Sequence, residues 1–436
     1  MTRAAPVPCV PAWACSWAWA LPLVLASAAA TAAAEGIENA AGSTATIERA
    51  FAITGGDLAV AGGSIAIGGI SDLFLEADAR GSNRRLWAVT DRGPNGLVEV
   101  HEGRGKAKRR TMLAPEFVPS LVLLDTSWMA EAGAAKTETG TVAVERIVPL
   151  KGRSGRPLSG RPNGVGRDEA VHSPDGSTRL AADDNGVDTE GVVAAGDGGF
   201  WLVEEYRPSI LRVAADGTLL SRHVPVGDAL PGAETNVVAN LPARYAGRTH
   251  NRGFEAVAIT PDRTRLFALL QSPLDRKHAG ASEPAGSVPL LVFDTAARKP
   301  AAEHEYRLDQ ADADGKLCAM ACLGATTLLV LEQADGGIAR LYLADTGFAP
   351  VRKTLVADLG PLRPAMIADV YGRGADAGRP LKLEGLAVVD ARHVLLANDN
   401  DFGVADAGSK AKKKAGPRSC LWLIELSEPL PLDTNI

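Results

Sequence analysis

The sequence lacks the features that mark several large classes of protein. Its 436 residues carry a net charge of −6, so there is no basic excess of the kind that nucleic-acid-binding faces use. No G-x-S-x-G elbow, C-x-x-C pair or zinc-type Cys/His spacing occurs. Beyond the N-terminal stretch, no segment approaches the roughly 18 apolar residues that a membrane-spanning helix needs. With 46% hydrophobic residues, the chain is expected to be globular, without nucleic-acid partners or stable membrane insertion.

Cysteine is also scarce, with five residues in the whole chain. Cys9 and Cys15 lie in the N-terminal stretch, which leaves Cys318, Cys322 and Cys420. If Cys318 and Cys322 share a strand, their Cα atoms lie roughly 13 Å apart, too far for a disulfide. Either of them could pair with Cys420, leaving one free thiol.

The N-terminus has the form of a secretory signal peptide. Arg3 precedes an apolar stretch, residues 13–30, which Pro22 interrupts. Three alanines then offer an A-x-A cleavage site, so cleavage is expected after Ala34. We therefore expect a periplasmic or secreted protein; an uncleaved anchor is the alternative.

A repeated pattern runs through the rest of the chain. A small or acidic residue opens an apolar run, a turn follows, and a second apolar run ends in a polar residue. The opening residues are Ser71, Glu190, Glu255, Cys318 and Glu384, and the corresponding ends are Asp91, Glu204, Gln271, Glu332 and Asn398. Each copy is typical of a β-hairpin, and one or two further strand-like runs follow it.

This recurrence, about every 65 residues, predicts an all-β fold, a β-propeller with five blades. We assign residues 65–427 to the propeller, 35–64 to a segment with a strand that closes the ring, and 428–436 to a C-terminal tail. The first two copies are 119 residues apart. That gap could hold a degenerate sixth blade between residues 105 and 185, or a long loop over the mouth from Gly152.

Polar ends of successive hairpins should ring one mouth of the central channel. Crowded carboxylates there would need a cation or shared protons. Ca²⁺ takes six to eight oxygen ligands, and the residues predicted to hold it are Asp91, Glu190, Glu384, Asn398, Asp399 and Asp401. For the run from Asn398 to Asp401 the alternative is a loop that hydrogen-bonds its own backbone.

The ordered motifs resemble the phytase-like family described by an esterase-like activity of phytase. They are SDLF with LWAVTDRGPNG, DTEGVV with FWLVEEYRP, NRGFEAVAIT with LFALLQS, and LEGLAVVD with LLANDNDFG. The resemblance implies hydrolysis of phosphoesters or carboxyl esters. Cys318 departs from the pattern, which puts a contribution from its blade in doubt.

Three arginines occupy corresponding places after the acids, namely Arg92, Arg207 and Arg252. Arginine binds phosphate or carboxylate bidentately, so these residues are candidates to hold a small anionic or ester substrate; each could instead pair with a neighbouring acid. Glu255 or Glu204 is the candidate general base. His250 is a weaker candidate, because a lone histidine is more often a structural hydrogen-bonding residue.

The predicted function is therefore that of an exported, calcium-dependent ester or phosphoester hydrolase. Two alternatives remain. One is a lactonase with an acidic calcium centre, and the other is a binding or scaffold propeller whose cation only holds the blades together.

Overall fold

The computed structural model describes one compact unit within residues 39–436. The described residues are 44–60, 63–77, 84–102, 105–130, 139–163, 170–275, 277, 284–310, 314–404 and 416–433. The predicted signal peptide and its cleavage site lie outside them. Among the described residues, no helix is long and apolar enough to cross a membrane.

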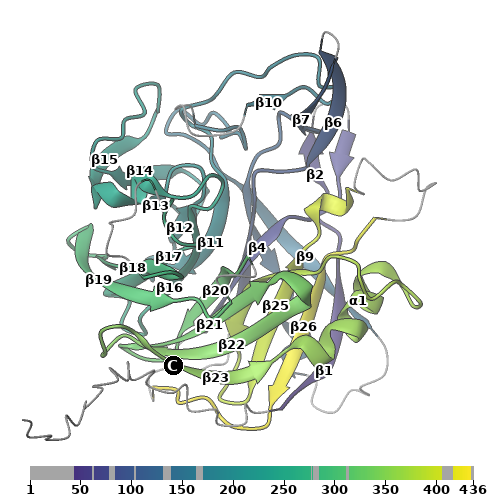
Figure 1. Cartoon of the computed structure of the whole chain (residues 1–436), viewed down its shortest axis with the longest axis vertical. Helices are drawn as coiled ribbons and strands as arrows, with labels where there is room; N and C mark the ends of the chain where they lie inside the picture. Colours follow the sequence, from purple (N-terminus) through teal and green to yellow (C-terminus); the bar gives the residue numbers. More distant parts are fainter. Residues whose placement is uncertain are drawn as a thin grey trace, which may run out of the picture. The chain divides into compact units, whose positions relative to one another are not determined.

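Five antiparallel meanders make up most of the unit (Figure 1). The first blade contains β4 (Ile70–Ala77), β5 (Arg84–Thr90), β8 (Ser120–Leu124) and β9 (Gly140–Pro149). The second contains β11 (Thr189–Ala194), β12 (Phe200–Glu204), β13 (Ser209–Val213), β14 (Leu219–Pro225) and, parallel to β14, β15 (Asn236–Leu241). The third contains β16 (Phe254–Ile259), β17 (Arg265–Leu270), β18 (Ser287–Asp294) and β19 (Lys299–Arg307). The fourth contains β20 (Lys316–Cys322), β21 (Thr327–Ala334), β22 (Ile338–Asp345) and β23 (Arg352–Asp358). The fifth contains β24 (Lys382–Val388), β25 (His393–Asp399), β26 (Cys420–Leu426) and the N-terminal β1 (Ala45–Thr54).

The innermost strands form a closed ring. They neighbour one another in the order β4, β11, β16, β20, β24 and back to β4. β1 pairs antiparallel with β26, so the first described strand completes the last blade, and it also pairs in parallel with β9 of the first blade. The predicted five-bladed propeller is confirmed.

The long gap between the first two repeats does not contain a sixth blade in the part that the structure describes. A hairpin of β6 (Asn95–Glu102) and β7 (Gly105–Met112) is inserted between the second and third strands of the first blade. It forms a separate small sheet with the short β10 (Val171–His172). A second small hairpin consists of β2 (Leu58–Val60) and β3 (Gly63–Ile65). This insertion and the long connection between β9, which ends at Pro149, and β11, which begins at Thr189, together account for the irregular spacing.

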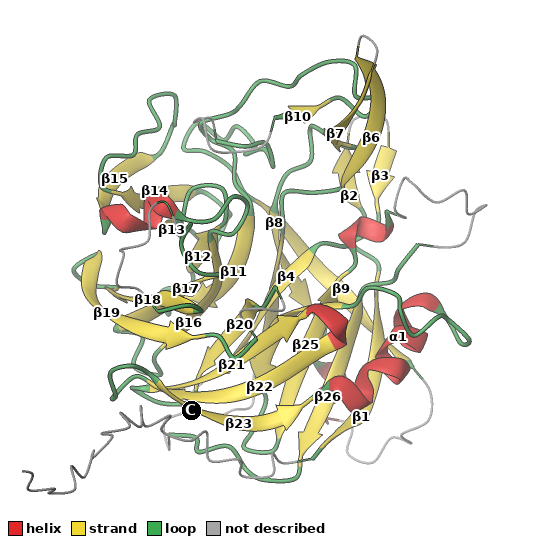
Figure 2. Cartoon of the chain, in the orientation of Figure 1, coloured by secondary structure: helices red, strands yellow, loops and turns green. Residues whose placement is uncertain are grey.

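Helices are few and lie at the ends of strands (Figure 2). The α-helix α1 (Arg363–Tyr371) follows the 3-10 turn η5 (Gly360–Leu362) and covers part of the fifth blade. Its Asp369 accepts a hydrogen bond from the indole nitrogen of Trp422, at 2.9 Å. Within the described residues, the other short 3-10 turns are η1 (Ser127–Ala130), η2 (Ala243–Gly247), η4 (Asp335–Gly337) and η6 (Asp401–Gly403).

The blades are held together by side chains packed between adjacent sheets. Strands β11 and β16 are buried along their whole length, as expected for strands covered on both faces. Between blades 2 and 3, for example, the rings of Trp201 and Phe293 meet edge to face at 5.7 Å. Cys318, Cys322 and Cys420 are free thiols, so the pairing with Cys420 is not formed.

Candidate functional site

Every innermost strand carries an irregularity at the same place. The register of each inner hairpin shifts by one residue near the start of its first strand, which leaves one extra residue without a partner across the ladder. The extra residues are Ser71, Glu190, Glu255, Cys318 and Glu384. A β-bulge re-aims the side chain of the extra residue. The repeat found in the sequence therefore marks five equivalent bulges around the channel.

On the second strand of each inner hairpin, the residue that pairs just before the bulge is turned away from the channel. Glu204 pairs with Thr189, and its carboxylate accepts hydrogen bonds from the side chain of Asn163 at 2.5 Å and the backbone N–H of Arg207 at 2.9 Å. Glu332 in blade 4 accepts from Tyr306 at 2.6 Å and forms an ion pair with Lys353 at 2.5 Å. These carboxylates therefore act as structural ties within and between blades.

Asn398 in blade 5 is likewise bound by backbone groups. Its side chain accepts from the N–H of Cys420 at 2.7 Å and donates to the carbonyl of Arg418 at 3.1 Å. The neighbouring Asn400 accepts from the N–H of Gly69 at 3.2 Å and of Phe402 at 3.1 Å. The amides of Asn398 and Asn400 therefore bind backbone groups, as expected for a loop that is held by its own hydrogen bonds.

In each inner hairpin, the residue that follows the one paired just before the bulge lies on the channel side, because successive side chains of a strand point to opposite faces. These residues are Asp91, Glu205, Gln271, Gln333 and Asp399. Gln271 hydrogen-bonds the bulged Glu255, and Gln333 donates to the thiol of Cys318 at 3.1 Å. Glu205 lies beside Glu190, and the charge of Asp399 acts on Glu384.

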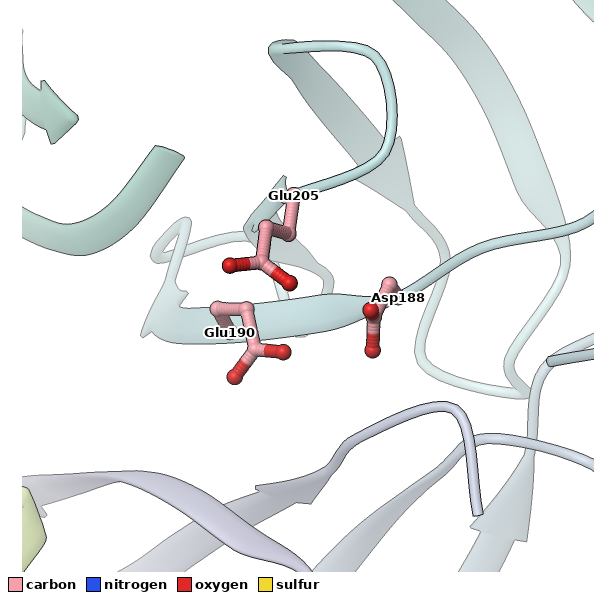
Figure 3. A group of neighbouring side chains, drawn as sticks. All are labelled: Asp188, Glu190 and Glu205. Carbon is pink, nitrogen blue, oxygen red and sulfur yellow. The ribbon is translucent and has the colours of Figure 1, made fainter. Parts of the chain in front are cut away.

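Three carboxylates of blade 2 form the centre of the site. Ligand oxygens of Asp188, Glu190 and Glu205 all lie within 4.8 Å of one another, and all three residues are buried (Figure 3). Burial and the negative charge of Asp188 raise the pKa of both Glu190 and Glu205 well above the ordinary value. Three buried carboxylates at this distance need a cation or protons to compensate their charge.

Further carboxylates surround this cluster. Burial raises the pKa of Glu255 to about 7, although Lys316 lowers it, and its Oε2 atom is buried without a hydrogen-bond partner. Burial and Asp399 raise the pKa of Glu384 and of Asp91. Asp72 is 1% exposed; its Oδ2 accepts from the N–H of Val192 at 3.0 Å, and its Oδ1 has no partner. Blade 4 adds no carboxylate to this group, because Cys318 and Gln333 occupy its bulge and rim positions.

Basic residues balance part of this charge. Arg92 forms an ion pair with Asp188 at 2.9 Å and donates to the side chain of Asn251 at 2.6 Å. Lys382 in blade 5 bonds Asp399 at 2.9 Å and Asp401 at 2.5 Å. Arg92 and Lys382 thus have carboxylate partners within the protein.

The structure brings together one group of the residues predicted from the sequence and leaves others apart. Interacting carboxylates and one arginine lie at the channel, namely Asp91, Glu190, Glu255, Glu384, Asp399 and Arg92. Asp401 lies beside them as a partner of Lys382, and Arg252 is held by both carboxylate oxygens of Asp314, at 2.8 and 2.9 Å. Glu204, Arg207 and Asn398 face structural partners instead. His250 is exposed in the turn before β16.

The sequence interpretation missed Asp72, Asp188, Glu205, Lys316 and Lys382. Three of them share a signal, because Asp188, Lys316 and Lys382 each stand two residues before a bulged residue. The predictions above rest on the opening and end positions of the repeat only. A comparison of the copies at every position would have shown a charged residue at this one in three blades.

The topology and the site together define a five-bladed propeller with a buried acidic centre at its channel. Residues 65–402 match the family described as "Phytase-like: Esterase-like activity of phytase". This protein belongs to that phytase-like family.

Other known proteins share less with the chain. An uncharacterized secreted protein of Arthroderma benhamiae is 26% identical over 245 residues, which is 50% of this chain and 46% of that protein. The chain thus matches less than half the length of that relative. Among solved structures, a luciferin-regenerating enzyme covers 84% of this chain and 97% of its own, with 9% identity and a TM-score of 0.35. An aldose sugar dehydrogenase of Streptomyces coelicolor covers 89% and 99%, with 12% identity and a TM-score of 0.33.

Proposed function

We propose that this protein is an exported, calcium-dependent hydrolase of esters or phosphoesters, with its active site at the acidic centre of the propeller. The observation that carries the proposal is the buried cluster of Asp188, Glu190 and Glu205. Membership of a family described by esterase-like activity supports the reaction class.

The donor set suits a hard cation such as Ca²⁺. All three ligand residues offer carboxylate oxygens, which calcium prefers, and no nitrogen or sulfur ligand belongs to the cluster. The nearby Oε2 of Glu255, buried without a partner, is a further unsatisfied oxygen of the kind that a bound ion or water satisfies. A cation held there would act as a Lewis acid on an ester or phosphoryl oxygen.

The chain itself supplies the groups for proton transfer and orientation. Glu255 is the proposed general base, because burial places its pKa at about 7, near the operating pH at which a base is most effective. Arg92 fixes Asp188 through both its side chain and its backbone N–H. Arg252 lies three residues before Glu255 at the rim, where it could orient an anionic substrate.

A serine-esterase mechanism has less support. Ser221 Oγ lies 3.5 Å from Nε2 of His223, whose Nδ1 lies 3.1 Å from Oδ1 of Asn240. This arrangement is buried in the outer strands of blade 2, where the ring of His223 lies 5.0 Å from that of Phe293. A substrate would have to open the packing between two blades to reach it.

Export is part of the proposal. It is supported by the signal-like N-terminal sequence and by the secreted relative.

The test is metal content and ester hydrolysis of the purified mature protein, with and without chelator. The substrates are p-nitrophenyl phosphate, p-nitrophenyl acetate, phytate and a simple lactone. We expect bound calcium and chelator-sensitive turnover that Glu205→Gln and Glu255→Gln abolish. Glu99→Gln, at an exposed glutamate of β6 paired with Lys106, is the matched control. Full metal-dependent turnover by folded Glu255→Gln protein would refute its role as base.

A second candidate function is a calcium-stabilised binding propeller. The carboxylates around the cluster come from blades 1, 2, 3 and 5, so a cation bound among them would tie inner strands together. Loss of thermal stability on chelation, without turnover of any of these substrates, would favour that function.

A further inference from the structure

The acidic ring around the channel is interrupted at blade 4. Where blades 2, 3 and 5 place Glu190, Glu255 and Glu384, blade 4 has the buried thiol of Cys318. Its rim residue Gln333 is occupied with blade 5, donating to the carbonyl of Leu383 at 2.5 Å. The bulge and rim positions of blade 4, both within the described residues, therefore contribute no carboxylate.

A lysine occupies that sector instead. Lys316 is the first residue of β20, two positions before Cys318. It is half-buried. Burial lowers the pKa of Lys316, but the nearby Cys318, Glu384 and Glu255 together raise it above the ordinary value. In the ladder Lys316 pairs with Gln333, the rim residue of blade 4, and paired residues lie on the same face of a sheet. Lys316 is therefore a cation on the channel face, at the edge of the acidic centre.

Lys316 differs from the other cations of the site in its contacts. Lys382 stands at the equivalent position of blade 5, and its ammonium is held by Asp399 and Asp401. Arg92 and Arg252 are held by Asp188 and Asp314. Within the described residues, the ammonium group of Lys316 has neither an ion pair nor a hydrogen bond.

We propose that Lys316 is the binding residue for an anionic group of the substrate, a phosphate or carboxylate, in the blade 4 sector. A cation held by the carboxylate cluster of blade 2 and the ammonium group of Lys316 would then contact different parts of one ligand. The proposal rests on the hydrolase function proposed above, because it places the substrate in the same channel mouth. It predicts a preference for anionic esters over neutral ones, with Lys316 as the residue that determines it.

The first test measures binding rather than turnover. Inorganic phosphate is titrated calorimetrically into the mature protein, with and without calcium. We expect Lys316→Gln to weaken phosphate binding about 10- to 100-fold, the usual effect of losing a charge-assisted hydrogen bond, and Lys316→Arg to retain most of it. Lys151→Gln is the matched control, because Lys151 pairs with Asp216 at a turn between β13 and β14; its phosphate affinity should equal that of the wild type.

The second readout is selectivity. Lys316→Gln should lower kcat/KM for p-nitrophenyl phosphate but not for the neutral p-nitrophenyl acetate. A lysine that only compensates the charge of Glu255 and Glu384 would change both substrates alike. Equal phosphate affinity of the wild type and Lys316→Gln, or no phosphate binding by the wild type, overturns the proposal.

A third measurement does not depend on a folded variant. Acetylation of the wild-type protein, followed by peptide mass spectrometry, should show phosphate protecting Lys316 and not Lys151; equal labelling of Lys316 with and without phosphate contradicts the proposal. The outcomes also separate the two proposals. Phosphate binding that depends on Lys316, without turnover, would refute the hydrolase function and support the anion site. Turnover together with unchanged phosphate binding in Lys316→Gln would support the hydrolase function and refute the anion site.

Discussion

Replacing Glu255 by glutamine should change how the stability of the metal-free protein depends on pH. The pKa of Glu255 is about 7 in the folded protein, against an ordinary value of 4.5. The folded state therefore binds an extra proton between these two pH values. The stability that this proton contributes is fully present below pH 4.5, and it is lost as the pH rises through 7.

The size of the effect follows from the shift. Each pKa unit corresponds to about 1.4 kcal/mol, so a rise from 4.5 to about 7 corresponds to about 3 kcal/mol of unfolding free energy. Glutamine cannot titrate, so this contribution disappears in Glu255→Gln. The pKa values of Glu190 and Glu205 stay raised in both proteins, because their larger causes, burial and Asp188, remain in the variant.

The assay is urea unfolding of chelator-treated wild type and Glu255→Gln between pH 4.5 and pH 8. The wild type should lose about 3 kcal/mol more than the variant over this range. Parallel curves would refute the reasoning, because they would mean that Glu255 is already ionised at low pH or solvated in the folded state. Calcium should then stabilise the wild type most at high pH, where its ligands are deprotonated.

Four other substitutions test the register and the ties between blades. Glu205→Gln should lower calcium affinity on the order of tenfold or more without loss of thermal stability. Glu204→Gln should cost about 1 to 3 kcal/mol of stability and leave calcium binding unchanged. Calorimetry measures the affinity and melting curves the stability, and the reverse pattern would contradict the assigned register. Gly253→Ala should weaken calcium binding in the same titration, because a Cβ there would lie 2.0 Å from the carbonyl oxygen of Glu205; unchanged affinity would show that the end of β12 can shift without affecting the site. Lys353→Met should lower the free energy of unfolding, measured with urea, by about 3 to 5 kcal/mol, because it leaves the buried Glu332 without its cation. A loss of calcium affinity in this variant would contradict the structural role of Glu332.

The repeat in the sequence was sufficient to predict the architecture. The inner strands of blades 2 and 3, for example, are buried almost throughout, so apolar runs of this kind recur along the chain. The interval between the first two copies was ambiguous, because β6 and β7 separate the inner hairpin of the first blade from β8 and β9. A hairpin inserted inside a blade has the same local pattern as a strand pair of a new blade.

The site was predicted less completely, and the reason is the bulge. In blade 2 the bulged Glu190 is matched by sequence offset with Glu204, but the structure pairs Thr189 with Glu204 and places Glu205 beside Glu190. One residue added to one strand reverses the face on which the following side chains lie. The offset within a copy cannot show which side of the ladder holds the extra residue.

Adjacent glutamates at the end of β12 give the strongest argument that the channel side is a ligand site. Glu204 faces donors, namely the amide of Asn163 and the N–H of Arg207. Glu205, one residue later, faces the carboxylates of Asp188 and Glu190. The same fold can thus satisfy a buried carboxylate with its own hydrogen-bond donors, and on the channel side of this strand it instead places three acids together. A cluster that only stabilised the protein would be better served by donors such as those around Glu204, so the arrangement around Glu205 supports the proposed cation site.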